Sequence, residues 1–154
     1  QRHEAVYLGI GAQKGRDLDI PGEMGPSVWT GTEYLGRVNS GEAVDLGRHV
    51  IVVGGGNTAV DAARTARRTG ADVTLLYRRS RVEMPAIAQE VDEAIEEGVH
   101  LALEAAPVRL EREGDTVRSL VACRIELGPP DASGRRRPVV MPDSEFVMPA
   151  FSAI

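Results

Sequence analysis

Three small residues with the spacing Gly-x-Gly-x-x-Ala could bind the pyrophosphate of a dinucleotide. They are Gly54, Gly56 and Ala59, and they directly follow an apolar run. The first would allow a tight strand-to-helix turn, the second a close approach of phosphate to the backbone, and the third close helix packing. The phosphates would contact the first amides of the helix. We therefore predict a cofactor-binding turn made of Gly54, Gly55, Gly56, Asn57, Thr58 and Ala59.

A second group of candidates follows the next apolar run. An NAD-specific unit carries an acidic residue about 20 positions after the glycines, where it binds the ribose 2′-hydroxyl. Here Tyr77 occupies that place, and Arg78, Arg79 and Arg81 follow it. A guanidinium can bind a 2′-phosphate with two hydrogen bonds and can stack on adenine, so we predict a preference for NADPH. Arg78 and Arg79 are favoured because they directly follow the strand. The alternative is a solvated basic turn.

The other reactive residue types indicate no catalytic or metal site. Cys123 is the only cysteine, and the three histidines are far apart in the sequence, which excludes an internal disulfide and a multi-cysteine metal or iron–sulfur site. We interpret Arg135, Arg136 and Arg137 as a flexible, solvated loop, and the acidic residues from Glu90 to Glu97 as a water-facing helix surface. We therefore name no catalytic residue.

Alternating strand and helix patterns place the glycine turn. His49–Val53 and Asp72–Tyr77 are predicted strands on either side of a long helix. Pro85 is predicted to open another helix, with Ile87, Val91, Ala94 and Ile95 on one face, Gly98 as its end and a third strand at 99–103. Alternating apolar and polar residues then predict antiparallel strands at 108–112, 117–127, 138–141 and 145–150. The fold class is α/β, a Rossmann-type parallel sheet with an antiparallel β-meander.

Length and charge bound the kinds of function. The chain has 154 residues, 42% of them hydrophobic, which suits one packed domain, and it lacks a membrane-length apolar stretch or a signal pattern. We expect a cytoplasmic protein. The net charge of −5 argues against nucleic acid as a partner. Residues 48–81 nevertheless hold seven arginines against two aspartates, which suits a small phosphate-bearing ligand.

These motifs together resemble the NADPH-binding domain of the glutamate synthase small (β) subunit and related flavoprotein oxidoreductases. The resemblance covers essentially the whole chain, and it rests on residues 52–64, Tyr77-Arg78-Arg79, Met84-Pro85-Ala86 and residues 96–99. Residues 6–15 resemble a strand of that family beside the flavin, and 20–23 the segment that leaves it. Because neither end of the sequence is typical of a complete protein, we expect a piece of a longer one.

The resemblance implies a two-dinucleotide-binding-domain flavoprotein. Residues 1–47 would be the tail of an FAD-binding domain and a linker, 48–145 the NADPH-binding domain, and 146–154 a strand that returns to the FAD domain. The full-length protein would pass hydride from NADPH to FAD and electrons onward to iron–sulfur clusters or a partner subunit. The chain alone would have negligible turnover.

The sequence departs from the family pattern at three places. The FAD-binding glycine motif is absent, Gly9-Ile10-Gly11 replaces Ala-Thr-Gly, and Ala150-Phe151-Ser152 replaces Ala-Ile-Gly. The redox-active Cys-x-x-Cys of thioredoxin reductase-type relatives is also absent, which argues against disulfide reduction. Two other functions remain open, a non-catalytic NAD(P)-sensing or assembly module and a self-contained NADPH dehydrogenase.

Overall fold

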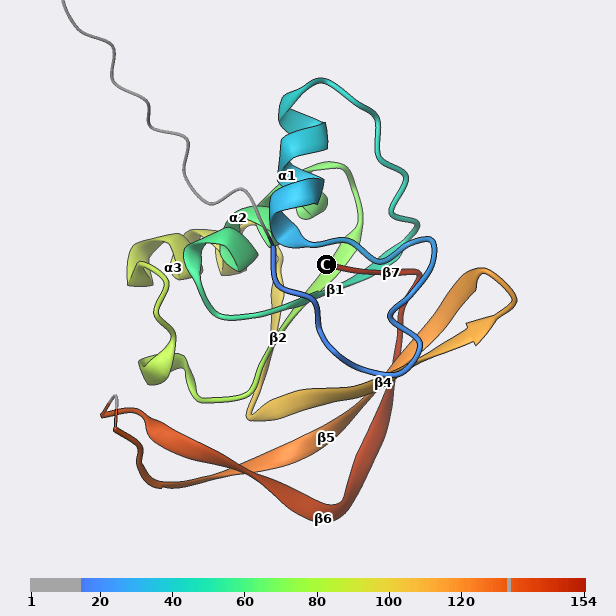
Figure 1. The fold of residues 1–154 in the computed structure, drawn as a ribbon. Helices are drawn as coiled ribbons and strands as arrows, with labels where there is room; N and C mark the ends of the chain where they lie inside the picture. The colour runs from blue at the N-terminus through green and yellow to red at the C-terminus, as the bar shows by residue number, and fades with distance from the viewer. Residues whose placement is uncertain (1–14, 133) are drawn as a thin grey trace, which may run out of the picture.

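A parallel sheet lies between a layer of helices and an antiparallel meander (Figure 1). The structure is a computed structural model that describes residues 15–132 and 134–154, so residues 6–14 of the strand expected from the resemblance lie outside the described residues. The helices are α1 (Gly31–Asn39), α2 (Asn57–Arg68) and α3 (Ala88–Glu96), with a 3₁₀ helix, η1, at Arg81–Glu83. The predicted α/β fold with a meander is confirmed.

The parallel sheet has the strand order β3-β2-β1-β7. Its strands are β1 (His49–Val53), β2 (Asp72–Tyr77), β3 (His100–Leu103) and β7 (Ser152–Ala153). β1 pairs with β2 on one side and with β7 on the other. Because β-branched residues fill β1, this strand suits the buried centre of a sheet.

Alternate side chains of β1 point into two separate cores. Val50 and Val52 pack against the helices, where the small side chains of α2 let the helix lie close to the sheet. Ile51 faces the opposite way and packs with Leu120 of the meander. The period of two along the strand thus gives each layer its own core.

The meander consists of β4 (Ala105–Glu113), β5 (Thr116–Pro130) and β6 (Arg136–Pro149) in that order. The two short strands predicted at 138–141 and 145–150 are one long strand, β6. Its register with β5 shifts between the pairs Cys123↔Glu145 and Ile125↔Val140. Asp143, in the irregular stretch, has a φ of +51°, so the sequence pattern is interrupted although the strand continues.

The helix predicted from Pro85 begins later, at Ala88. The amide of Ala86 donates to Gly55 O (3.1 Å) and that of Ile87 donates to Asn57 Oδ1 (3.0 Å). These two bonds hold the residues before α3 in an extended path along the glycine turn. Val91 is buried, as the predicted apolar face requires, whereas Ile87 is 54% exposed because it precedes the helix.

Helix α1 spans Gly31–Asn39. Thr30 caps it, since its hydroxyl accepts from the amide of Glu33 (3.3 Å), and Tyr34 anchors it in the helix-side core. No helix in the described part of the chain has the length and apolar character needed to cross a membrane.

Candidate functional site

Gly54 makes the turn between β1 and α2. Its φ is +148°, and a Cβ there would lie 2.9 Å from the Cβ of Ala59. The amide of Gly54 donates to Leu76 O (3.0 Å), which joins the turn to β2. The predicted geometry of these two positions is therefore present, a left-handed turn followed by a helix in close contact with it.

Gly55 is a packing position. A Cβ there would lie 2.5 Å from Cε2 of Tyr77, so the ring packs directly against the glycine backbone. The Tyr77 hydroxyl donates to Glu83 O (2.8 Å). The side chain at the end of β2 thus joins the glycine turn to η1, a contact that the sequence did not predict.

Gly56 starts α2 and faces open space. It has an extended backbone, no neighbour within 4 Å of a Cβ placed on it, and no side-chain hydrogen bond capping the helix. The first turn of α2 contains no acidic residue. Because the first amides of a helix have no partner within it, they present hydrogen-bond donors and a positive dipole end here. This arrangement suits an anionic group.

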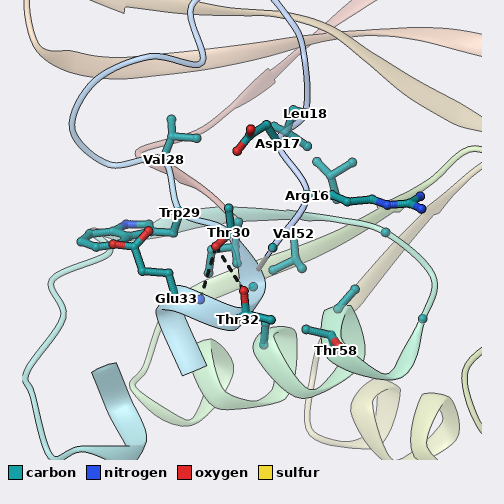
Figure 2. A pocket seen from close by; sticks show the side chains of 18 of the residues that line it. Arg16, Asp17, Leu18, Val28, Trp29, Thr30, Thr32, Glu33, Val52 and Thr58 are labelled. Carbon is teal, nitrogen blue, oxygen red and sulfur yellow. Dashed lines mark hydrogen bonds between the residues drawn. The ribbon is translucent and has the colours of Figure 1, made fainter. Parts of the chain in front are cut away.

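A cleft of about 790 Å³ opens beside this helix end. Gly54 and residues 56–59 line one wall, and residues 28–33 line the other. The N-terminus of α1 meets that of α2 here, because a Cβ on Gly31 would lie 3.1 Å from Cγ2 of Thr58. Figure 2 shows Thr30 and Thr32 joined by a 3.4 Å hydrogen bond at this wall.

The sequence did not identify residues 28–33 as part of a site. A usable signal was Thr30-x-x-Glu33, a pattern typical of a helix start, which would have placed the N-terminus of α1. Asn57 was predicted as a cofactor-binding residue. It lines the cleft, and its Oδ1 accepts a hydrogen bond from the amide of Ile87 (3.0 Å).

The segment that follows β2, residues 78–81, is called the basic turn, and its three arginines have different surroundings. Arg78 is exposed, and its guanidinium has no hydrogen-bond or ion-pair partner among residues 15–132 and 134–154. Arg79 is buried and donates to Asp131 Oδ2 (2.8 Å) and to Arg136 O (2.7 Å). Arg81 forms an ion pair with Asp92 of α3. None of these arginines lines the cleft.

The loop that we interpreted as flexible and solvated is tied to η1 through Arg136. Its Nε donates to Glu83 Oε1 (2.5 Å) and its Nη2 to Ser80 Oγ (3.2 Å). These contacts hold the pKa of Glu83 at about 2, because Arg136 and then Ser80 stabilise its ionised form. Arg136 is thus exposed, as expected of a solvated side chain, but it is paired with Glu83 and Ser80 and fixed to η1.

The acidic helix surface is also engaged. Glu97 accepts from Arg64 (2.7 Å) and Arg68 (2.6 Å), and Glu93 pairs with Arg64 (2.9 Å). The two arginines lower the pKa of Glu97 to about 2. Much of the positive charge between residues 48 and 81 is thus used to join α2 to α3, and the expectation of a purely water-facing surface was wrong.

The remaining reactive groups do not assemble into a site. Cys123 is buried in β5. Within the described ranges, no cluster of three or more His, Cys, Asp or Glu side chains is arranged to hold a metal ion.

Curated proteins similar to this chain are named as NADPH-linked oxidoreductases. The NADPH-Fe(3+) oxidoreductase subunit beta of Geobacter sulfurreducens is 45% identical over 153 residues, which cover 96% of this chain and 23% of that protein. The glutamate synthase (NADPH) small chain of Azospirillum brasilense is 42% identical, with 97% of this chain and 34% of that protein covered. The chain thus spans between a fifth and about a third of these relatives' length.

The fold is also found among solved structures. The thioredoxin reductase from Streptococcus pyogenes aligns with a TM-score of 0.65 and 20% identity over 92% of this chain and 40% of that one. The pyridine nucleotide-disulphide oxidoreductase family model matches residues 2–126. The resemblance to glutamate synthase small subunits is confirmed by relatives of that name. The chain therefore belongs to the pyridine nucleotide-disulphide oxidoreductase family.

Proposed function

We propose that this chain is the NADPH-binding part of a flavoprotein oxidoreductase. In the full-length protein NADPH would supply a hydride to FAD, and the electrons would go onward to iron–sulfur clusters or a partner subunit. The names of the relatives support this class of reaction. The observation that carries the proposal is the uncapped start of α2, where Gly56 faces open space beside a cleft.

The residues of the turn suit the phosphates of a dinucleotide. The amides that begin α2 would donate to the pyrophosphate, and Gly56 would let it approach the backbone. The geometry at Gly54 and Ala59 keeps this helix end at the edge of the sheet. The cleft is large enough for one end of a dinucleotide, and its walls would exclude water from it.

The adenosine end would lie on the other side of the glycine turn, toward the end of β2. Tyr77 packs on Gly55, so the chain passes close to the glycine turn at this point. Arg78 directly follows Tyr77 and is exposed. Its guanidinium would bind the 2′-phosphate of NADPH, which NADH lacks. Arg79 and Arg81 would add positive charge near the 2′-phosphate while they stay paired with Asp131 and Asp92.

We also propose that residues 48–145 form the NADPH-binding unit and that 1–47 and 146–154 connect it to an FAD domain. The described parts of the two connections lie side by side. Trp29 N donates to Ala153 O (2.9 Å), and Ala153 N donates to Ser27 O (3.0 Å). Adjacent entry and exit segments are typical of a domain inserted into another. Both segments also reach the cleft, through Val28 and Ile154.

Anaerobic mixing of the full-length protein with NADPH tests this function. We expect bound flavin to lose its oxidised absorbance, and to do so faster with NADPH than with NADH at equal concentration. A protein that purifies without flavin, or flavin that stays oxidised with both nucleotides, would contradict the proposal.

A further inference from the structure

The tip of the β5–β6 hairpin is fastened to the basic turn. Arg79 Nη2 donates to Asp131 Oδ2 (2.8 Å), and Arg79 Nε donates to Arg136 O (2.7 Å). In return, Arg136 donates to Glu83 of η1 and to Ser80 of the basic turn. These partners are more than 50 residues apart in the sequence. The meander therefore contacts the end of the parallel sheet at this point (Figure 1).

Arg79 is held by this contact. Only 6% of the residue is exposed, and Asp131 is itself partly buried. A buried guanidinium is stable only while its donors are paired, and its departure would leave the carboxylate of Asp131 without this partner. The backbone is fixed too, because Arg79 O accepts from the amide of Glu104 (3.2 Å). With Nε and Nη2 both paired and the residue almost fully buried, Arg79 offers little surface to a ligand.

Arg78 lies between two fixed neighbours. Tyr77 is packed on Gly55, and Arg79 is packed under the hairpin. Arg78 lies in the bend that follows β2, and it is exposed whereas the residues directly before and after it are buried. Its main chain is thus held in place while its guanidinium is unpaired among the described residues, an arrangement that preorganises it for a ligand.

We infer that Arg79 and Asp131 are positioning residues, and that through them the meander hairpin sets the discrimination between NADPH and NADH by Arg78. This inference rests on the proposed function. It assigns Arg79 a different role from the one its sequence position predicts, which is direct binding of the 2′-phosphate. The two roles differ in what should happen when Asp131 loses its charge.

The two roles of Arg79 predict opposite effects of an Asp131 substitution on binding of the 2′-phosphate. The variant Asp131→Asn removes a negative charge near the site and weakens the hold on Arg79. If Arg79 were a phosphate ligand, its release would strengthen binding, and the loss of a nearby carboxylate would do the same through long-range electrostatics. If Arg79 positions Arg78, the same substitution should weaken binding despite the more positive surroundings.

Two small probes avoid any dependence on flavin or nicotinamide. Adenosine 2′,5′-bisphosphate carries the 2′-phosphate and adenosine 5′-monophosphate lacks it, and calorimetry on the full-length protein measures both. We expect wild type to bind the bisphosphate at least about 10-fold more tightly. In Asp131→Asn we expect a loss of about three- to ten-fold for the bisphosphate and little change for the monophosphate.

Asp143→Asn is the matched control. Asp143 is exposed on the same meander, and its φ of +51° is one that Asn tolerates well. This control should leave both affinities unchanged. Arg78→Ala should abolish the preference, and adding Asp131→Asn to it should cost nothing further, because the two act through one group.

Arg79→Lys gives a second route if Asp131→Asn does not fold. Lysine keeps the charge and can pair with Asp131, but a single ammonium cannot reproduce the fork that also reaches Arg136 O. It should weaken binding of the bisphosphate selectively. Tighter or unchanged bisphosphate binding in these variants, or equal losses for both probes, would overturn the positioning role. A wild-type protein without any preference would overturn the proposed NADPH selectivity as well.

Discussion

Gly54 and Gly56 of the dinucleotide motif meet different physical demands, and substitution can separate them. Gly54 is required by the fold, because its φ is positive and a Cβ would press on Ala59. Gly56 has an extended backbone and open space around it, so the fold alone does not require glycine there. In the proposed function, the approaching phosphate would use this space.

We predict that Gly56→Ser weakens dinucleotide binding at least about 10-fold without destabilising the protein. Serine fits the extended backbone at the start of α2 and is a favourable capping residue, so the melting temperature should stay the same or rise. Its side chain would occupy the place of the phosphate. Thermal denaturation and calorimetric titration with NADPH measure the two effects.

Gly54→Ala is the matched control within the same turn. It should lower the free energy of unfolding by about 1–3 kcal/mol, because alanine at this φ is strained and would contact Ala59. Equal destabilisation by both substitutions, or unchanged affinity in Gly56→Ser, would refute the division of roles.

The surroundings of single residues could be predicted from the sequence only where their contacts are local. The turn at Gly54 and the contact of Ala59 follow from a short motif and were predicted. The burial of Arg79 depends on Asp131, which lies 52 positions further along the chain. No local pattern identifies such a partner. Arg78 and Arg79 were therefore both predicted to bind the 2′-phosphate, although one is exposed and the other buried.

At the scale of elements, ion pairs join α2 to α3. Glu97 accepts hydrogen bonds from Arg64 and Arg68 of α2, and Arg67 Nε donates to Glu97 O (3.0 Å). The helix that begins at the glycine turn is thereby fixed near its C-terminal end as well. This connection holds α2 at the end opposite to the amides that we propose bind phosphate.

We predict that Glu97→Gln reduces stability in a pH-dependent way. The pKa of Glu97 falls from 4.5 to about 2 in the folded protein, so its ionised form stabilises the fold at neutral pH. That contribution, about 1 kcal/mol for a partly exposed pair, is lost as the pH falls from 4.5 toward 2. Urea denaturation at pH 7 and pH 3 should show a difference from wild type that shrinks at the lower pH.

Glu96→Gln provides the control for this prediction. Glu96, the exposed last residue of α3, directly precedes Glu97 and forms no ion pair with any residue in the described ranges. Its substitution should have little effect at either pH. A stability loss in Glu97→Gln that is equally large at pH 7 and pH 3 would show that the ionised carboxylate is not responsible.

The elements themselves were largely predictable, because hydrophobic periodicity and glycine positions mark them. β1, α2 and β2 follow directly from the sequence pattern. The late start of α3 was not predictable, since it depends on hydrogen bonds from residues 86 and 87 to the glycine turn. The continuity of β6 was missed because an irregular stretch breaks the alternation of side chains within it.

At the scale of the whole molecule, the glycine turn lies where the layers meet. Helices cover one face of the parallel sheet and the meander covers the other (Figure 1). The cleft opens at the start of α2. The meander also reaches the basic turn through its β5–β6 tip. The sequence predicted both sheets, but not the contact between the tip of the second sheet and the arginines that follow β2.

We propose that this protein selects NADPH through Arg78, and calorimetric titration with NADPH and NADH measures that selection. The full-length wild type should bind NADPH at least about 10-fold more tightly than NADH, and Arg78→Ala should bring the two affinities together. Arg137→Ala, which removes an exposed arginine of β6, should keep the preference. Equal or tighter binding of NADH by wild type, or an undiminished preference in Arg78→Ala, would show that Arg78 does not select NADPH.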